Sequence, residues 1–435
     1  MEINTAIVAG TGKSGISATK LLVNHGVKVY LFDENKDRDI EAIKEKTGDS
    51  ELVQIELGEL GEDALSSSQL MVISPGIPVD APFTDVVRNA GIPIWSEIEL
   101  AYHYGKGKIA AITGTNGKTT TTALVGEIVK AHNAKTIVVG NIGIPYTELC
   151  DTTDDDSDTV AEISSFQLET VIDFHPNVSA ILNLTPDHLN RHYTFENYGN
   201  VKFSITKNQT MDDVTVLNYD DEHTRAMGEK AKDHCHVVYF SRLEKPAGGV
   251  YVEDGDIILE DGDKKINVLA IKDLKLMGAH NVENVLAAVG ISYYMGVPVD
   301  VIRDVATSFK AVAHRIEYVD TIDGVAYYND SKGTNPDAAI KGIQAMVAPT
   351  FLIGGGYDKG SEYDEWIEAF DGKVKWLVLI GQTAQKIADC AKRHGFNSII
   401  FEENLQDAVA YCHENAVDGD AVLLSPACAS WGQFD

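Results

Sequence analysis

Residues 108–120 read KIAAITGTNGKTT, and this stretch decides the fold of the middle of the chain. An apolar run suited to a buried strand leads into a glycine-containing loop, and a helical stretch follows. Such a loop brings backbone N–H groups to a phosphate at the start of a helix. The loop consists of Gly114, Thr115, Asn116, Gly117, Lys118, Thr119 and Thr120. The stretch therefore predicts a nucleotide-phosphate site on a strand–loop–helix unit.

The loop is a shortened form of the usual phosphate-binding loop. Ile112 stands where the standard spacing has glycine, but the final Gly-Lys-Thr is intact. Lys118 is expected to neutralise phosphate charge, and the Thr119 hydroxyl is expected to bind Mg²⁺. A chance Gly-Lys-Thr sequence would not be flanked by a strand and a helix in this order. The alternative of an accidental match is therefore disfavoured.

Outward from this loop, the chain alternates short apolar strands with helical stretches over its whole length. This pattern is typical of α/β folds with parallel sheets, and 435 residues leave room for about three domains. We expect three domains, formed by residues 1–96, 97–310 and 311–435. Polar strand-to-helix junctions occur in all three stretches, so each one has a candidate ligand site.

Composition excludes several classes of function. Against 36 Lys and Arg there are 66 Asp and Glu, which gives a net charge of -30. A surface for nucleic acid or anionic lipid needs clustered positive charge, so neither partner is expected. No apolar run approaches the ~18 residues of a membrane span, and no membrane insertion is expected. The five cysteines form no CxxC pair, and the N-terminus lacks a basic leader, so a reducing cytoplasm fits best.

The N-terminal stretch carries a second glycine motif. Gly10, Gly12 and Gly15 lie between a predicted strand and helix, and Asp33 ends the next strand. This is the dinucleotide fingerprint, in which the glycines allow a tight turn around a diphosphate. NAD or FAD is one interpretation, and a glycine-rich turn in any doubly wound domain is another. The motif supports a diphosphate-containing ligand more safely than a named cofactor.

Two metal-ligand candidates follow later strands of the middle stretch. Glu162 ends the strand TVAEI, and His188 follows the strand NVSAILNL. Ligands gather at such strand ends in open α/β sheets, and carboxylates suit Mg²⁺. A lone His is more often structural, but with Glu162 and a phosphate loop nearby a metal role is favoured. Lys202 lies in a predicted helix, where an isolated lysine is normally solvated, so residue chemistry alone does not single it out.

The third stretch contains two polar loops. His314-Arg315 precedes a strand, and residues 329–335, NDSKGTN, end another strand and open a helix. Helix capping by Thr334 or Asn335 would explain part of this cluster, but it would not require Lys332 or Asp330. Residues 425–430, SPACAS, form a similar loop after the last strand. Both loops predict small-ligand sites, and no His and Asp arrangement that would make Cys428 a nucleophile can be recognised.

These motifs together resemble the Mur ligases, the ATP-dependent amide-forming enzymes of peptidoglycan synthesis. The resemblance runs from residue 8 to residue 434 and includes GTNGKTT, GNIG, AEISSFQLE, DHLNRH, GAHNVEN, HR, NDSKGTN and SPACAS in family order. The last two loops favour the members that add D-glutamate. The resemblance implies a Rossmann-like UDP-binding domain, a central ATP-binding domain of the phosphate-loop type and a Rossmann-like C-terminal domain for the amino acid.

The resemblance also implies roles for ATP and two Mg²⁺ ions. ATP would be bound by the 114–120 loop together with Asn281, Asn284, Arg315 and Asp330. The metal ligands would be Thr119, Ser165, Glu162, His188 and Lys202. Lys202 would act as N6-carboxylysine, because a carbamate turns a cationic side chain into an oxygen ligand. Lys118, His188 and Lys202 are thus the catalytic candidates.

For the other substrates, the resemblance implies UDP-N-acetylmuramoyl-L-alanine and D-glutamate. The first would be bound by Gly12, Lys13, Ser14, Asp33, Ser74, Gly76 and Asn141. The second would be bound by Lys332, Thr334, Lys359, Ser430 and Phe434. The muramoyl carboxylate would attack the γ-phosphate of ATP, and the D-glutamate amine would attack the resulting acyl phosphate. The enzyme is expected to act as a monomer.

Three departures from the family pattern stand out. Asn190 and Gly432 occupy positions where Asp is usual, and the chain ends at Asp435, before the family's usual last segment. The C-terminal domain is therefore expected to lack that segment. The alternatives are another Mur ligase, a folylpolyglutamate synthase-like ligase, a non-catalytic nucleotide-sugar sensor and an NAD-dependent dehydrogenase. The dehydrogenase reading gives the 114–120 loop no role.

Overall fold

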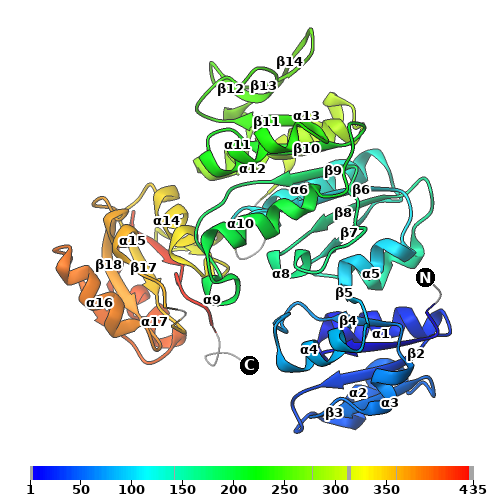
Figure 1. Cartoon of the computed structure of the whole chain (residues 1–435). Helices are drawn as coiled ribbons and strands as arrows, with labels where there is room; N and C mark the ends of the chain where they lie inside the picture. Colours follow the sequence, from blue (N-terminus) through cyan, green and yellow to red (C-terminus); the bar gives the residue numbers. More distant parts are fainter. Residues whose placement is uncertain (1–2, 142, 277, 311–314, 359, 431–435) are drawn as a thin grey trace. The chain divides into compact units, whose positions relative to one another are not determined.

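The computed structural model describes residues 3–141, 143–276, 278–310, 315–358 and 360–430 (Figure 1). The chain divides into two compact units. The first comprises Met1–Lys272 and Asn284–Thr307, and the second comprises Asp273–Glu283 and Ser308–Asp435. Three separate sheets are present, two in the first unit and one in the second. Within the described ranges, no helix has the length and apolar character needed to cross a membrane.

The N-terminal sheet has five parallel strands in the order β3-β2-β1-β4-β5. Its strands are β1 Thr5–Ala9, β2 Lys28–Asp33, β3 Val53–Leu57, β4 Leu70–Ile73 and β5 Ile94–Ser96. Its helices are α1 Lys13–Asn24, α2 Ile40–Thr47, α3 Glu62–Ser67, α4 Pro82–Asn89 and α5 Glu97–Tyr104. The strand order reverses at β1 and β4, and the crevice beyond such a switch point is where doubly wound sheets bind ligands.

The central sheet has nine strands in the order β14-β13-β12-β11-β10-β9-β6-β8-β7. The part from β7 to β12 is parallel, and β12 to β14 pair antiparallel at one edge. Its strands are β6 Lys108–Thr113, β7 Ile137–Gly140, β8 Asp158–Glu162, β9 Val178–Ile181, β10 Val214–Asn218, β11 His236–Ser241, β12 Gly249–Glu253, β13 Asp256–Asp261 and β14 Lys264–Ala270. The α-helices along this part of the chain are α6 Lys118–His132, α7 Tyr146–Leu149, α8 Ser165–Leu168, α9 Leu189–His192, α10 Phe195–Phe203, α11 Glu222–Ala231, α12 Ala279–Tyr294 and α13 Val299–Ser308.

The C-terminal sheet has six strands in the order β15-β16-β20-β17-β18-β19, and only the β15–β16 pair is antiparallel. Its strands are β15 Glu317–Ile322, β16 Val325–Asn329, β17 Thr350–Gly354, β18 Val374–Leu379, β19 Ile399–Phe401 and β20 Ala421–Leu424. Its helices are α14 Pro336–Ala345, α15 Asp364–Glu368, α16 Ala384–Arg393 and α17 Leu405–Asn415. The expected α/β class with three sheet-containing domains is confirmed.

Two local signals explain where the chain reverses. Asp254-Gly255 and Asp323-Gly324 each connect an antiparallel pair, and all four residues have positive φ between 50° and 85°. Two-residue turns of this kind match the twist of the strands, and Asp-Gly is a favoured sequence for them. The helix expected directly after residues 329–335 is also present: α14 begins at Pro336, where proline suits the first helical turn, with Asn335 as the N-cap.

A single hydrophobic cluster explains why the first two sheets form one unit. It contains Val8 and Trp95 of the N-terminal sheet and Ile181 of the central sheet. Tyr146, which is fully buried, belongs to the same cluster. Apolar burial shared by both sheets couples them, because separating them would expose this surface to water. The C-terminal sheet has its own clusters on its two faces.

Candidate active site

The 114–120 loop connects β6 to α6, as the sequence predicts. Gly114 and Gly117 have φ of +149° and +83°, in the region that favours glycine. A Cβ at Gly117 would lie 2.2 Å from Oδ1 of Asn284, and one at Gly114 would lie 3.0 Å from Cβ of Leu182. Both glycines are therefore required by backbone conformation and by close neighbours.

Asn183, which follows β9, fixes the loop from the adjacent strand. Its carbonyl accepts a hydrogen bond from the N–H of Thr115 at 3.0 Å, and its Oδ1 accepts from the N–H of Asn116 at 2.8 Å. Its Nδ2 donates back to the carbonyl of Asn116 at 3.1 Å. The sequence motifs do not include Asn183, although a polar residue just beyond a buried strand is a usable signal. The loop is held in shape before any phosphate binds.

Lys118 turns back over the loop that precedes it. Its Nζ donates to the carbonyls of Gly114 and Thr115 at 2.9 and 2.7 Å. The first helical N–H groups of α6 have no partner within the helix, and together with the dipole they favour an anion at this end. Lys118 and the start of α6 thus supply positive charge at one place, which is what a polyphosphate needs.

Lys202 of α10 is buried against the same loop, and only 2% of its surface is exposed. Its Nζ donates to the Gly114 carbonyl at 2.9 Å and to Oγ1 of Thr113 at 3.3 Å, and it lies 4.8 Å from the ring centre of Tyr198. Burial holds the pKa of this amine well below its ordinary range, and the charge of Lys118 lowers it further. The fold therefore favours a neutral amine at this position.

Glu162 and Asn141 meet at the ends of β8 and β7. Asn141 donates from Nδ2 to Oε1 of Glu162 at 3.1 Å, and its N–H donates to the Glu162 carbonyl at 2.8 Å. Glu162 is 2% exposed, so its carboxyl group is buried. Its field raises the pKa of Lys202, which places these two groups within electrostatic reach. The structure thus brings together three predicted residues from separate strands and a helix.

Ser165, shortly after Glu162 in the chain, forms a buried contact with His192. Ser165 begins α8 behind a capping box of Ser164 and Gln167, and its Oγ lies 2.9 Å from Nε2 of His192. Burial lowers the pKa of His192 to about 4, with the charges of His188 and Arg191 acting in the same direction. A neutral imidazole orients the Ser165 hydroxyl. His192 belongs to the DHLNRH motif, but the sequence alone does not predict a role for it.

His188 is the residue before α9, and its backbone is left-handed with φ 54°. Its N–H donates to Oδ1 of Asp187 at 2.9 Å, and its Nε2 lies 3.5 Å from Oδ2 of the same residue. Phe166 packs against the imidazole ring edge-on. Asp187 therefore fixes the orientation of His188, while the departure at Asn190 is an exposed position on α9.

Arg191 connects the central sheet to the N-terminal sheet within the first unit. Its Nη2 lies 2.5 Å from Oε2 of Glu169 and donates to the Ile77 carbonyl at 2.8 Å. Its Nη1 donates to the Pro75 carbonyl at 3.3 Å. The side chain thus holds the turn after β4, which contains Ser74 and Gly76. The sequence pattern contained Arg191, but only the tertiary structure shows which turn it reaches.

The 10–15 loop of the N-terminal sheet packs so tightly that Gly10 and Gly15 have no room for a side chain. A Cβ at Gly15 would lie 1.8 Å from the Gly10 carbonyl oxygen, and one at Gly10 would lie 2.6 Å from Oγ of Ser74. Lys13 at the start of α1 donates to the carbonyl of Gly143, in the loop after β7. Gly12 and Ser14 are on the same loop and first turn, so these predicted UDP-site residues follow β1, next to Ser74 at the end of β4.

Asp33 closes this loop from the end of β2. Its Oδ2 accepts from the N–H and Oγ1 of Thr11 at 3.1 and 2.6 Å and from Nε of Arg38 at 3.2 Å. Burial acts to raise the pKa of Asp33, but the bonds from Thr11 and Asn35 and the Arg38 charge outweigh it and lower the pKa. The carboxylate thus fixes the position of Thr11 in this loop through two hydrogen bonds.

In the second unit, Asp330 joins the two polar loops predicted from the sequence. Oγ of Ser425 donates to Oδ2 of Asp330 at 2.7 Å, and the N–H of Ala427 donates to the Gly333 carbonyl at 2.9 Å. Burial raises the pKa of Asp330 to about 6, against the Ser425 hydrogen bond and the Arg315 charge, which lower it. Hydrogen bonds between buried residues therefore join the NDSKGTN and SPACAS loops.

Three of the predicted amino-acid site residues, Lys332, Thr334 and Ser430, lie on these joined loops. Lys332 and Thr334 follow Asp330, and Ser430 follows Ala429, whose carbonyl accepts from the N–H of Tyr357 at 2.7 Å. Asn335 caps α14 through Oδ1, so the capping interpretation holds for that residue. Lys359 and Phe434 lie outside the described residues, as do His314 and Gly432.

Asn281 and Asn284 both lie on α12 and are nearly buried. Oδ1 of Asn284 accepts a hydrogen bond from Oγ1 of Thr121 at 3.3 Å and approaches Gly117. Asn284 therefore packs directly against the phosphate loop. Asn281 belongs to the second unit, so the chain passes from one unit to the other between these two residues.

Comparison with known proteins assigns the family. Residues 4–96 match the Mur ligase MurD-like N-terminal domain, residues 112–292 match the Mur ligase middle domain, and residues 314–428 match the Mur ligase glutamate ligase domain. These matches cover most of the chain, in the order of its three sheets. The chain belongs to the Mur ligase family.

Several curated proteins similar to this chain carry the name UDP-N-acetylmuramoylalanine--D-glutamate ligase. The protein of Lachnospira eligens is 56% identical over 435 residues, covering 100% of this chain and 96% of the relative. The protein of Lachnoclostridium phytofermentans is 51% identical, covering 98% of this chain and 94% of the relative. That of Clostridioides difficile is 46% identical, covering 99% and 94%.

Solved structures share the fold at lower identity. The UDP-N-acetylmuramate-alanine ligase MurC of Thermotoga maritima has a TM-score of 0.62 at 20% identity and covers 98% of this chain and 96% of its own. MurF of Acinetobacter baumannii has a TM-score of 0.64 at 16% identity, covering 97% and 90%. MurF of Thermotoga maritima, solved in complex with ADP, has a TM-score of 0.58 at 16% identity, covering 96% and 90%. At these identities the likeness supports the three-domain architecture.

Proposed function

We propose that this protein joins D-glutamate to UDP-N-acetylmuramoyl-L-alanine with hydrolysis of ATP to ADP and phosphate. The carrying observation is the phosphate loop, where Lys118 and the buried Lys202 both donate to the Gly114 carbonyl at 2.9 Å. The curated relatives, 46% to 56% identical over nearly the whole chain, supply the choice of D-glutamate. The product is a precursor for peptidoglycan synthesis.

The chemical problem is that a carboxylate must attack a polyphosphate, so two anions must meet. Lys118 and the N-terminus of α6 lower this repulsion by placing positive charge at the phosphates. The muramoyl-alanine carboxylate forms an acyl phosphate as ADP leaves, and the D-glutamate amine then attacks the acyl carbon and releases phosphate. Positioning supplies most of the remaining acceleration, because both steps join reactants that are already held together.

The donor groups around the loop fit Mg²⁺. Glu162 and Ser165 are buried oxygen donors, and Thr119 lies at the first turn of α6. Oxygen donors are the ligands that Mg²⁺ prefers, and a bound ion would supply charge neutralisation at the phosphates. His188, held by Asp187, would serve the second ion together with Lys202.

Lys202 is proposed to carry the second ion as N6-carboxylysine. Its amine is buried among Thr113, Gly114 and Tyr198, where an unmodified cation has few compensating anions. A carbamate forms when the neutral amine attacks CO₂ and loses a proton to solvent. We expect ¹³C-labelled bicarbonate to give one carbamate carbonyl resonance in the full chain, and a Lys202→Ala variant to lack it. A resonance that persists in that variant would exclude this site.

The substrates are proposed to distribute over three domains. Residues 1–96 would bind the UDP substrate, residues 97–310 ATP and residues 311–435 D-glutamate. The tightly packed 10–15 loop fits a diphosphate, and Lys332 on the joined loops of the second unit fits the carboxylates of D-glutamate. A monomer would suffice for this arrangement, and the reaction belongs in the cytoplasm, where ATP and UDP-sugars are made.

The test is an ADP-release assay on the full chain, with each substrate omitted in turn. Full turnover is expected only with ATP, Mg²⁺, UDP-N-acetylmuramoyl-L-alanine and D-glutamate present together. Stimulation by L-alanine, diaminopimelate or folate in place of the proposed substrates would identify another ligase of the same fold. Binding of the UDP-sugar without any ATP turnover would identify a nucleotide-sugar sensor. Binding of NAD would favour an NAD-dependent dehydrogenase instead.

A further inference from the structure

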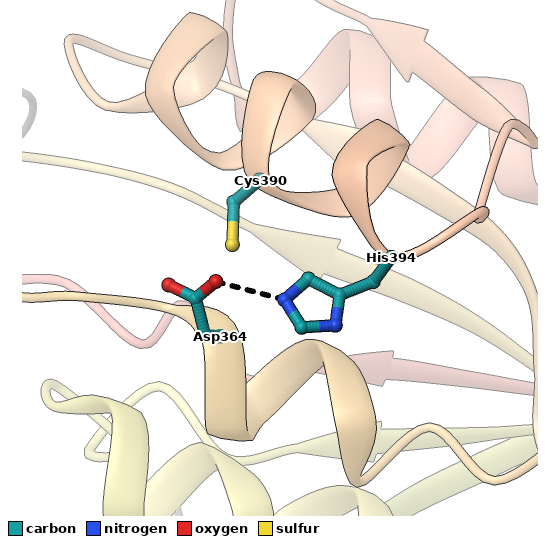
Figure 2. A group of neighbouring side chains, drawn as sticks. All are labelled: Asp364, Cys390 and His394. Carbon is teal, nitrogen blue, oxygen red and sulfur yellow. Dashed lines mark hydrogen bonds and ion pairs between the residues drawn. The ribbon is translucent and has the colours of Figure 1, made fainter.

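Three side chains with different ligand chemistry converge between α15 and α16 in the second unit (Figure 2). They are Asp364, Cys390 and His394, and one ligand atom from each lies within 4.8 Å of the other two. Cys390 and His394 are four residues apart at the end of α16, so both occupy the same face of that helix. Asp364 begins α15 and faces them from the other side.

The orientation of His394 is that of a metal-binding imidazole. Its Nε2 lies 2.8 Å from Oδ1 of Asp364, and its Nδ1 lies 3.6 Å from Oε1 of Glu368. Metal-bound histidines usually place one ring nitrogen on the ion and the other on a carboxylate, which fixes the tautomer. Glu368 supplies that second carboxylate from the same helix as Asp364. The imidazole is therefore already aimed into the cluster.

The cluster is closed on one side and open on the other. Cys390 is 2% exposed, while the side chains of Asp364 and His394 are 43% and 26% exposed. An ion could enter from solvent and meet the sulfur at the bottom of the site. Burial, followed by the charge of Asp364, raises the pKa of Cys390 to about 11, so the thiol holds its proton until a cation displaces it to solvent.

The donor set distinguishes between cations. Thiolate and imidazole ligands select zinc and similar ions over Mg²⁺, which prefers oxygen. Tetrahedral zinc would separate its ligand atoms by about 3.3 to 3.8 Å, given the usual bond lengths. To reach that spacing, the 2.8 Å between Asp364 and His394 must widen, and the sulfur of Cys390, within 4.8 Å of both, must lie at a similar distance. Arg393 now lies 3.4 Å from Oδ1 of Asp364, but its side chain is 60% exposed and can move away.

A comparable cluster in the first unit does not share these properties. Glu99, His103 and Asp173 also lie within 4.8 Å of one another. The carboxylate of Glu99, however, accepts three backbone hydrogen bonds, from residues 172–174 at 2.7 to 3.0 Å. Those bonds occupy the oxygens that a metal would need, so Glu99 has a structural role.

We propose that Asp364, Cys390 and His394 bind a zinc-class divalent cation, with a water molecule as the fourth ligand. These residues belong to the second unit, whereas the proposed Mg²⁺ ligands belong to the first, and the two sets differ in ligand type. Asp364 directly follows Tyr363, whose hydroxyl lies 3.2 Å from Sγ of Cys428 in the SPACAS loop. A cation at this site would therefore fix the start of α15 next to a loop of the proposed amino-acid site.

The test uses Co²⁺ as a spectroscopic probe on the full chain after chelation of bound metals. One equivalent of Co²⁺ is expected to bind and to give the near-ultraviolet absorption of a cobalt–thiolate bond, and Zn²⁺ is expected to abolish it by competition. Cys390→Ser should lose the absorption, while Cys412→Ser, another buried thiol of the same unit, should keep it. Absence of the absorption in the unaltered chain, or its persistence in Cys390→Ser, would overturn the proposal.

Two further variants separate a metal site from a surface ion-pair cluster. Glu368→Gln should weaken Co²⁺ binding about tenfold through loss of the partner of Nδ1, whereas Glu365→Gln on the same helix should leave it unchanged. Arg393→Gln removes a competing cation and should tighten binding. X-ray absorption of the unaltered zinc-loaded chain should show one sulfur neighbour, which needs no variant to fold. A shell of oxygen and nitrogen alone would overturn the proposal.

Discussion

Lys202 shows how burial changes the chemistry of a single residue. An isolated lysine on a helix is normally solvated, but this amine contacts Thr113 and Gly114 and is 2% exposed. Desolvation lowers the pKa of this amine, which favours its neutral form. Lys118 contacts the same Gly114 carbonyl and is proposed to bind phosphate. The different roles proposed for the two lysines thus follow from their different environments.

Lys118→Ala is expected to reduce ATP-dependent phosphate release by about a thousandfold, since it removes charge at the transferred phosphate. It also removes the two hydrogen bonds that hold the Gly114 and Thr115 carbonyls. Phosphate release with all substrates present is the measurement. Lys130→Ala, an exposed lysine on the same helix, is the control and should retain full activity. Near-normal turnover of Lys118→Ala would contradict the assignment of the loop.

Asp330 should make the stability of the second unit pH-dependent. Its folded pKa of about 6 lies above the ordinary value of 3.8, so the folded state binds the proton more tightly. Its favourable contribution is therefore complete below about pH 4 and is lost as the pH rises through about 6. The full loss amounts to about 3 kcal/mol, of which about 2 kcal/mol falls between pH 4.5 and pH 7.

Asp330→Asn should remove this pH dependence, and urea unfolding of the full chain at pH 4.5 and pH 7 measures it. Asp389→Asn, an exposed carboxylate on α16, should unfold with the same pH dependence as the unaltered chain. Equal pH dependence in Asp330→Asn and the unaltered chain would show that Asp330 titrates normally.

At the scale of elements, the site is built from strand ends and the loops that follow them. β6 provides the phosphate loop, β8 ends at Glu162, and Asn183 follows β9. The register pairs Ile112 with Glu162 and Thr113 with Ile181, so these three ends lie at one edge of the central sheet. Parallel pairing is thus what gathers residues that are separated by up to seventy positions in the chain.

Gly117→Ala is expected to destabilise the first unit by more than the strain of the left-handed backbone alone. Gly117 and Gly255 have nearly the same φ, +83° and +85°, but only Gly117 has a neighbour within 4 Å of an added Cβ. Gly255→Ala should cost about 1 kcal/mol, from the left-handed conformation, and lower the melting temperature of the first unit by about 3 °C. Gly117→Ala should lower it by at least about twice as much, because Asn284 must also move. Equal shifts by calorimetry would contradict the close contact.

At the scale of the whole molecule, an acidic protein must bind acidic substrates. The net charge is -30, yet the proposed substrates are all anions. The cations at the predicted sites, Lys118 and Lys332 among them, act over short distances, while the overall charge repels the substrates over longer ones. Local positive charge and global negative charge therefore act in opposite directions.

Moderate salt is accordingly expected to raise kcat/KM for ATP. Screening shortens the reach of the overall repulsion from about 30 Å at 10 mM salt to about 10 Å at 100 mM, while contacts at the loop persist. An increase of about twofold to threefold over this range in KCl is the expected result. Sucrose at equal osmolality should have no such effect. A steady fall of kcat/KM with KCl would show that the sites dominate even at long range.

The two-unit division of the molecule follows from shared burial. The N-terminal and central sheets contribute to one hydrophobic cluster, whereas the C-terminal sheet buries its faces in clusters of its own. The three-domain expectation from chain length was correct for the sheets. It did not indicate that two of them pack as one unit, because shared apolar burial depends on which faces meet and not on length.

The sequence by itself determined the α/β class, the phosphate loop, the two hairpins on Asp-Gly and the helix start at Pro336. These features depend on residues adjacent in the chain, whose backbone preferences act locally. It also placed Glu162 at the end of a strand, whereas His188 lies seven residues beyond the end of β9, directly before α9.

Only the tertiary structure decided which distant residues meet. Asn183 clamps the phosphate loop, Arg191 holds the turn after β4, and Ser425 pairs with Asp330 across the second unit. The burial of Lys202, and the convergence of Cys390 and His394 with Asp364, depend on packing between elements in the same way. Burial and long-range hydrogen bonds exist only once the chain is folded, so local preference cannot encode them in a readable pattern.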